Sequence, residues 1–206
     1  MRYAIERLRT DVMARLGEIA RPQSQSSASS SAVDVPWPED IIGLKARSLL
    51  PEVGGSLIRE APLPLLDCGA SHSPGTPEVY AMRRMPCGLY GAEVRLPGGF
   101  LRLVSVKMSD WGRSAVSVVL PESSGWNRQW SVESGIAGCP DRPRAYVDSD
   151  GGGILLRLMG SGSEDAALEW LNVWSVPEID SSGEFDFPET LYPDLVAGIS
   201  GRLIKE

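Results

Sequence analysis

Any serine or cysteine nucleophile in this chain would depend on one imidazole, because His72 is the only histidine. A Ser–His or Cys–His pair needs such a group as its general base. His72 lies in a stretch rich in serine, proline and glycine, residues 71–75, which is typical of a solvated loop. No serine stands in the G-x-S-x-G elbow of serine hydrolases. We therefore favour a loop histidine over a hydrolase site.

The cysteines offer a second kind of chemistry, since Cys68, Cys87 and Cys139 could join His72 around a zinc ion. Structural zinc sites usually take their ligands as close pairs from a turn, and only Cys68 and His72 are that close. The first twenty residues are charged and contain no apolar leader-like run. We expect three reduced thiols in an intracellular protein, with no metal and no cofactor.

Two acidic segments resemble known sites. Residues 148–153, Asp-Ser-Asp-Gly-Gly-Gly, resemble the start of a calcium loop, but the twelfth loop position, which needs glutamate, is Met159. Because Asp and Gly tolerate positive φ, a β-hairpin turn is the better interpretation.

Residues 184–189, Glu-Phe-Asp-Phe-Pro-Glu, hold neighbouring carboxylates of the kind that hydrolyse glycosides within a cleft. We expect them instead in an exposed loop before the last helix.

Most of the tryptophans lie in or beside the expected β region, at positions 111, 126, 130, 170 and 174. Trp170 and Trp174 are four residues apart, so in a strand they point to the same face. The favoured interpretation is that most of them anchor the core or flank hairpins. The alternative is an aromatic platform that binds a carbohydrate or a peptide.

The balance of charge argues against tight nucleic-acid binding. The net charge is −7, and lysine occurs only at positions 45, 107 and 205. A duplex-binding protein needs clustered basic side chains to neutralise phosphates. An acidic surface remains compatible with a wall past which DNA slides without adhering. No stretch approaches the 18 apolar residues of a membrane span, so we expect no membrane partner.

Helices are expected at both ends of the chain. Residues 1–21 form an N-terminal helix, because apolar residues at positions 5, 8, 12, 16 and 19 make one stripe and Pro22 ends it. Residues 22–33 are a Ser-rich linker. A helix tethered in this way docks either on its own body or on another molecule. Residues 179–206 form a C-terminal helix that rejoins the helical body.

The middle of the chain divides into two parts. Residues 34–78 are the helical part of the body, with two short helices that meet at Pro51 and end near residues 61–64. Residues 79–178 form an inserted β domain, with strand candidates near 94–96, 100–108, 116–120, 144–147, 154–159 and 169–176. The expected fold class is α+β: a small helical bundle from N- and C-terminal helices with an inserted antiparallel sandwich or small barrel.

Three segments carry a resemblance to a known family. Residues 96–104 (Leu-Pro-Gly-Gly-Phe-Leu-Arg-Leu-Val) resemble the start of a strand in bacteriophage neck proteins. Residues 126–130 (Trp-Asn-Arg-Gln-Trp) are similar to the polar-aromatic segment that follows, and residues 135–143 to the glycine-proline turn after it. Together with the order of elements, residues 34–206 resemble phage head–tail adaptors of the tail tubular protein A type.

The resemblance implies a non-enzymatic structural protein of the virion. It would be a homo-oligomeric ring, expected to be a dodecamer, that links the portal protein to tail proteins after assembly in the bacterial host cytoplasm. No residue would be catalytic, and DNA would pass through the ring without specific binding. The alternative function is a carbohydrate- or peptide-binding module that uses the Trp-rich β surface.

Overall fold

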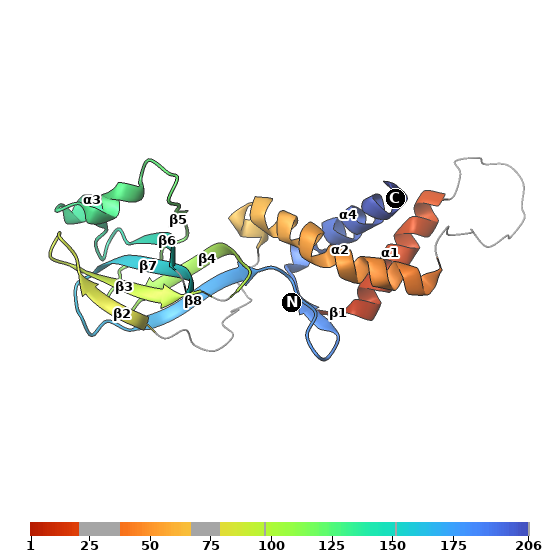
Figure 1. Ribbon diagram of the computed structural model, residues 1–206, viewed down its shortest axis with the longest axis horizontal. Coiled ribbons are helices and arrows are strands. Elements are labelled where there is room, and N and C mark those ends of the chain that lie inside the picture. The colour runs from red at the N-terminus through yellow and green to blue at the C-terminus, as the bar shows by residue number, and fades with distance from the viewer. Residues whose placement is uncertain (21–37, 67–78, 97, 151, 206) are drawn as a thin grey trace, which may run out of the picture. The chain divides into compact units, whose positions relative to one another are not determined.

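The computed structural model describes residues 1–20, 38–66, 79–96, 98–150 and 152–205. The expected linker at 22–33 lies outside this range. The chain divides into two compact units, Met1–Asp67 with Val176–Glu206, and Cys68–Ser175. We call these the helical unit and the β unit, and the bounds of the latter differ from the expected 79–178. The α+β class, with helices from both chain ends and a β region between them, is confirmed (Figure 1).

The helical unit is a bundle of α1 (Ile5–Ala20), α2 (Glu39–Glu60) and α4 (Tyr192–Lys205), each packed against the other two (Figure 1). The expected stripe of α1 forms its contact face, because Leu8, Val12 and Leu16 are buried. The N-terminal helix therefore docks on its own chain. The facing helices contribute buried residues at the same kind of spacing: Ile42, Leu50 and Ile58 from α2, and Leu195, Ile199 and Leu203 from α4.

Helix α2 has two close contacts at glycines, one with α4 at Gly198 and one with Pro177, before β9, at Gly54. A Cβ atom on Gly198 would lie 2.8 Å from Cγ1 of Val53, and one on Gly54 would lie 2.7 Å from Cγ of Pro177. Real Cβ atoms do not come so near, so the two segments can lie this close only because glycine has no side chain. Gly198 therefore sets how closely α4 can approach α2, and Gly54 sets how closely the segment at Pro177 can approach it.

The expected break at Pro51 is wrong, because α2 continues through it as one helix. Proline removes the backbone bond to the carbonyl four residues earlier, here that of Arg47. Arg47 and Pro51 are both exposed, so water can satisfy that carbonyl. The helix ends at Glu60, where Ala61 turns extended, as the proline-rich stretch predicts. A short 3-10 helix, η1 (Leu63–Leu65), follows.

Two further expectations for the helical unit are wrong. The chain begins as a strand, β1 (Arg2–Ala4), which pairs antiparallel with β9 (Glu184–Asp186), so residues 184–189 are not an exposed loop. Phe185 and Phe187 are buried while Glu184 and Asp186 are partly exposed, which is the alternation of a strand. Another 3-10 helix, η3 (Glu189–Leu191), leads into α4.

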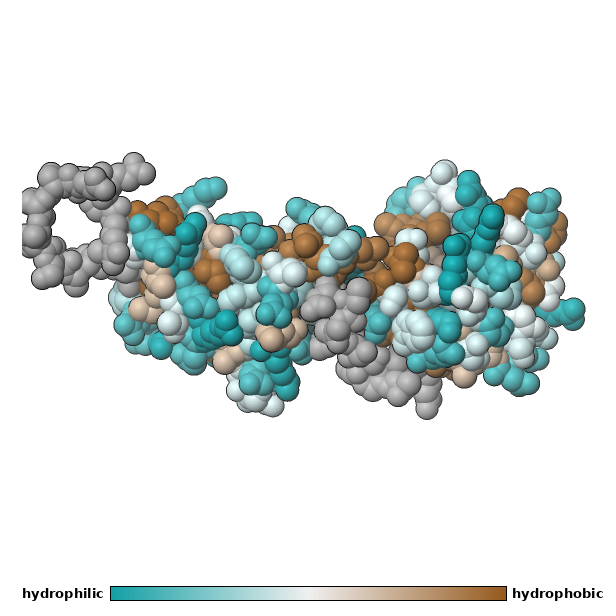
Figure 2. Space-filling model, turned by 180° about the vertical axis from the view of Figure 1, so that it is seen from behind, coloured by the Kyte–Doolittle hydropathy of each residue, from teal (hydrophilic) through white to brown (hydrophobic). Residues whose placement is uncertain are grey.

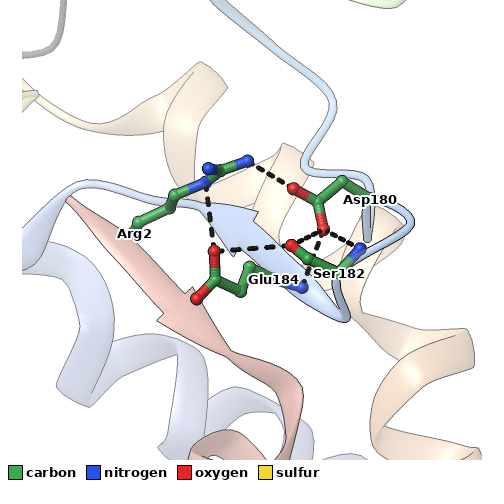
Figure 3. A network of polar contacts seen from close by, with 4 residues as sticks. All are labelled: Arg2, Asp180, Ser182 and Glu184. Atoms are coloured by element: carbon green, nitrogen blue, oxygen red, sulfur yellow. Dashed lines mark hydrogen bonds and ion pairs between the residues drawn. The ribbon is translucent and has the colours of Figure 1, made fainter.

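A polar network fixes the loop before β9 to β1 (Figure 3). Asp180 accepts hydrogen bonds from the Ser182 hydroxyl at 2.6 Å and from the backbone N–H groups of Ser182 and Glu184 at 2.9 and 3.0 Å. Arg2 from β1 pairs with Asp180 and, at 3.5 Å, with Glu184. The hydrogen bond from the Ser182 hydroxyl and that from the Glu184 N–H lower the pKa of Asp180, with smaller help from Arg2.

The β unit contains two sheets. One has the order β2 (Val79–Arg84), β3 (Tyr90–Arg95), β7 (Gly153–Ser161), β6 (Arg144–Asp150) and β5 (Val118–Val119), and the other pairs β4 (Phe100–Met108) with β8 (Leu168–Ser175). Buried residues of both sheets meet in one core: Ala92, Val94, Leu103, Val106, Met108, Ala145, Leu156, Leu158, Leu171 and Val173. This is a sandwich, and the described strands form no closed barrel.

The pairing is antiparallel with one exception. The turn at residues 148–153 is the predicted β-hairpin, confirmed by the β6–β7 register in which Asp150 faces Gly153. By contrast, β5 pairs parallel to β6, so the all-antiparallel expectation is wrong at this edge. A long connection, with η2 (Trp126–Trp130) and α3 (Ser134–Ala137), carries the chain from β5 back to the start of β6, which a hairpin cannot do.

Candidate functional site

The outer face of the five-stranded sheet, which points away from the sandwich core, is covered by the connection that contains η2. Tyr146 and Met159 are buried on this face beside Met85, with Trp126 packed against them. The rings of Trp126 and Tyr146 meet edge to face with centroids 5.9 Å apart. Burial raises the pKa of the Tyr146 hydroxyl, and the nearby guanidinium of Arg144 partly offsets the rise.

A chain of ion pairs crosses four strands on the same face. Glu93 of β3 contacts Arg83 of β2 at 3.3 Å and Arg157 of β7 at 3.2 Å, and Arg157 contacts Asp148 of β6 at 2.9 Å. Glu93 is only 5% exposed. A buried carboxylate is costly unless it is paired, and here two guanidinium groups neutralise it. The four groups thus form a balanced network that holds Arg157 in place.

Arg157 in turn positions an exposed tryptophan. Its guanidinium lies 5.6 Å from the ring centroid of Trp130 and donates to the side-chain oxygen of the buried Gln129 at 3.4 Å. Trp130 is nevertheless 51% exposed. One side of the ring therefore rests on a fixed cation while much of the ring meets solvent, which is the arrangement of an anchor residue at an interface.

More apolar side chains are exposed next to Trp130 in the sequence. Val132 is 75% exposed, and Ile136 on α3, which packs against η2, is also exposed. Val116 and Leu120, on either side of β5, are half-exposed. Single exposed apolar residues need no explanation, but a set on one connection marks an interaction surface. We call Trp130, Val132 and Ile136 the η2–α3 surface.

The other tryptophans have different roles. Trp111 and Trp174 are buried, whereas Trp170 is 40% exposed and lies over the ammonium group of Lys107 at 5.0 Å. Lys107 also forms an ion pair with Glu169 at 2.7 Å. Since Leu171 and Val173 face the core, Trp170 and Trp174 lie on the opposite face of β8, as the spacing predicts, but only Trp170 is open to solvent.

The helical unit also exposes apolar residues at the end where α1 finishes and α2 begins. Leu44 is 69% exposed, and Ile19 and Ile41 are exposed as well. Figure 2 shows hydrophobic surface, in brown, at this end of the unit. This second surface lies on a different unit from the η2–α3 surface, so the chain offers two separate regions for protein contacts.

The residues singled out for catalysis or metal binding do not come together in the described part of the chain. Cys68 and His72 lie outside it, and Cys87 and Cys139 are free thiols. No three His, Cys, Asp or Glu side chains among the described residues could hold a metal ion. Asp148 belongs to the ion-pair network and accepts a hydrogen bond from the Ser149 N–H at 2.8 Å.

Sequence reasoning missed the groups that build the outer face. Glu93 and Arg157 are charged residues inside apolar strands, and Arg157 stands between Leu156 and Leu158, which face the core. That alternation is the signal that could have placed Arg157 on the second face. Its pairing with Glu93 and Asp148 depends on strand order, which no local pattern reveals.

The comparisons with known proteins give no family. No protein-family model matches the chain, and no curated protein matches it either. Among the described residues, no helix is both long and apolar enough to cross a bilayer.

Proposed function

We propose that this chain is a non-enzymatic structural protein of a phage virion, a head–tail connector that assembles as a ring between the portal and the tail. The observation that carries the proposal is the arrangement along the chain. Helices from both ends of the chain close one unit, and a β sandwich is inserted between them. This is the order of elements that the resemblance to head–tail adaptors implies.

The exposed apolar residues support an assembly role. A ring is built from heterologous contacts, in which one patch of each copy meets a different patch of the next. The η2–α3 surface on the β unit and the residues around Leu44 on the helical unit are two such patches. Exposed apolar side chains grouped in this way are typical of surfaces that bind another protein. The aromatic ring of Trp130, held by Arg157, is the expected anchor.

The test is assembly with the portal. The chain is co-expressed with a portal protein from the genome that encodes it, and the complex is examined by native mass spectrometry and electron microscopy. We expect a ring of copies on the portal, and Trp130→Ala should weaken assembly about tenfold or more, as loss of an interface anchor does. Trp170→Ala is the matched control, because it removes an exposed tryptophan that lies on β8 and not on η2. A chain that stays monomeric beside a correctly assembled portal would overturn the proposal.

A second candidate function is a carbohydrate- or peptide-binding module, and the exposed ring of Trp170 favours it. Its contact with Lys107 holds the ring in one orientation, as a stacking platform requires. Tryptophan fluorescence measured across a glycan and peptide panel tests this function. Saturable changes that Trp170→Ala abolishes would support it, and an unchanged signal throughout would remove it.

A further inference from the structure

A cavity of about 260 Å³ lies at the β5 edge of the five-stranded sheet. It lies between the segment that leads into β5 and the start of β6. The polar residues of its lining are Arg113, Arg144, Ser114 and Ser117, and the rest includes Val116, Val119 and Pro143. The side chain of Arg144 also forms a hydrogen bond with the Tyr146 hydroxyl. The side chains that line the cavity therefore offer hydrogen-bond donors and positive charge, with no carboxylate among them.

The positive charge in this cavity is not balanced within the described part of the chain. Neither Arg113 nor Arg144 forms an ion pair with a described carboxylate, although the protein carries a net charge of −7. The carboxylate of Asp141 lies beside Gly112, 3.2 Å from where a Cβ would be, but it pairs with neither arginine. On the same sheet, Arg157 is neutralised by two carboxylates. Two like charges that line one hollow repel each other, and a bound anion would relieve that repulsion.

Arg144 is held by a strand, and Arg113 lies in a bend just before a single β-bridge. Arg144 is the first residue of β6, between β5 and β7, and its side chain lies on the same face as Tyr146. Arg113 stands two residues before Ala115, whose N–H and C=O both bond to Val106 of β4 at 2.9 Å. The two arginines thus come from separate segments of the chain. The strand fixes the backbone of Arg144, and the bridge at Ala115 fixes the backbone two residues after Arg113.

We propose that this cavity binds a phosphate group, either as inorganic phosphate or as a small phosphate monoester. Two guanidinium groups and two hydroxyls match the several oxygens of a tetrahedral dianion, and arginine is the residue best suited to bidentate phosphate contacts. The volume lies below the roughly 300–1,000 Å³ of sites for larger ligands, so the rest of the ligand must be small. The site is independent of the connector function.

The experiment is a titration followed by NMR. ¹⁵N-labelled full chain in phosphate-free buffer is titrated with inorganic phosphate and, separately, with glycerol 3-phosphate, at ionic strength held constant with chloride. We expect saturable shifts of the backbone amides of Ser114, Ser117 and Arg144. Tighter binding of the free ion identifies inorganic phosphate as the ligand, and tighter binding of the ester identifies a monoester.

Variants separate a built site from general charge attraction. Arg113→Gln and Arg144→Gln should each weaken binding about tenfold or more, because each removes charge-assisted hydrogen bonds. Arg142→Gln is the control, because it removes the same charge two residues from Arg144 and Arg142 does not line the cavity. It should weaken binding by less than about twofold. Unchanged spectra elsewhere show that the variants fold. Equal losses for Arg142→Gln and Arg144→Gln, or no saturable shift at roughly 10 mM phosphate, would overturn the proposal.

Discussion

Replacing Gly198 by alanine tests the close approach of α2 and α4. In an open helix position this change stabilises a protein by up to about 1 kcal/mol, because alanine has the higher helix propensity. At Gly198 the new Cβ would lie 2.8 Å from Cγ1 of Val53. Val53 is β-branched and nearly buried, so it has few rotamers into which it can move. The two helices must then separate.

The structure gives the size of the effect. Forcing an extra methyl group into a packed interface costs about 1–3 kcal/mol. After subtraction of the propensity gain, Gly198→Ala is expected to lose up to about 2 kcal/mol in the free energy of unfolding. Gly201→Ala on the same helix is the matched control, since no atom lies within 4 Å of its new Cβ. That variant should be more stable than the parent by up to about 1 kcal/mol.

The assay is urea unfolding with two probes. Circular dichroism at 222 nm reports mainly on the helical unit, which holds α1, α2 and α4. Tryptophan fluorescence reports on the β unit in a Trp37→Phe background, because the described tryptophans all lie there: Trp111, Trp126, Trp130, Trp170 and Trp174. Gly198→Ala should lower the dichroism midpoint and leave the fluorescence midpoint unchanged. If Gly198→Ala is as stable as Gly201→Ala, the close packing inferred here is refuted.

Three further predictions concern polar contacts. Glu93→Gln leaves Arg157 without its buried counter-charge. It should lower the free energy of unfolding of the β unit by about 2–3 kcal/mol in urea unfolding followed by fluorescence. A change below about 0.5 kcal/mol would contradict the ion-pair network. Tyr192→Phe removes the hydrogen bond that the hydroxyl donates to Asp11 at 2.8 Å and should cost about 1–2 kcal/mol by dichroism. Because burial and Asp11 raise the pKa of Tyr192, the parent should also lose stability as the pH rises above 10.0, and the variant should lose less. Because the pKa of Asp180 is lowered, its carboxylate stabilises the folded state above pH 3.8, and this stabilisation is lost as the pH falls below that value. Asp180→Asn should therefore flatten the acid side of the stability profile measured by dichroism.

Local patterns in the sequence predicted the long elements well. The stripe that includes Leu8 and Leu16 is sufficient to place α1, because a helix with one apolar face must bury it. The hairpin after Asp148 followed from turn residues between two apolar runs. The sequence pattern did not predict that α2 continues through Pro51. Whether this proline breaks the helix depends on whether water can reach the carbonyl of Arg47, which has lost its backbone hydrogen bond. That exposure is a property of the bundle and not of the local sequence.

The short strands and the candidate sites were harder to predict. The alternation around Phe185 has a period of two, but a three-residue strand is stable only because β1 arrives from the other end of the chain. The parallel pairing of β5 with β6 also depends on a distant connection. The arginines of the cavity come from separate segments, at positions 113 and 144, and neither segment carries a motif. Their proximity is a consequence of strand order alone.

The insertion of the β unit has a consequence for how the protein is made. A ribosome releases α1 and α2 early, but α4 emerges only after the whole of Cys68–Ser175 has been translated. The nascent β sandwich can therefore complete its core while the first two helices still lack their third partner. During that interval the apolar face of α2 that packs against α4 stays uncovered, and slowing translation before residue 192 should prolong the exposure.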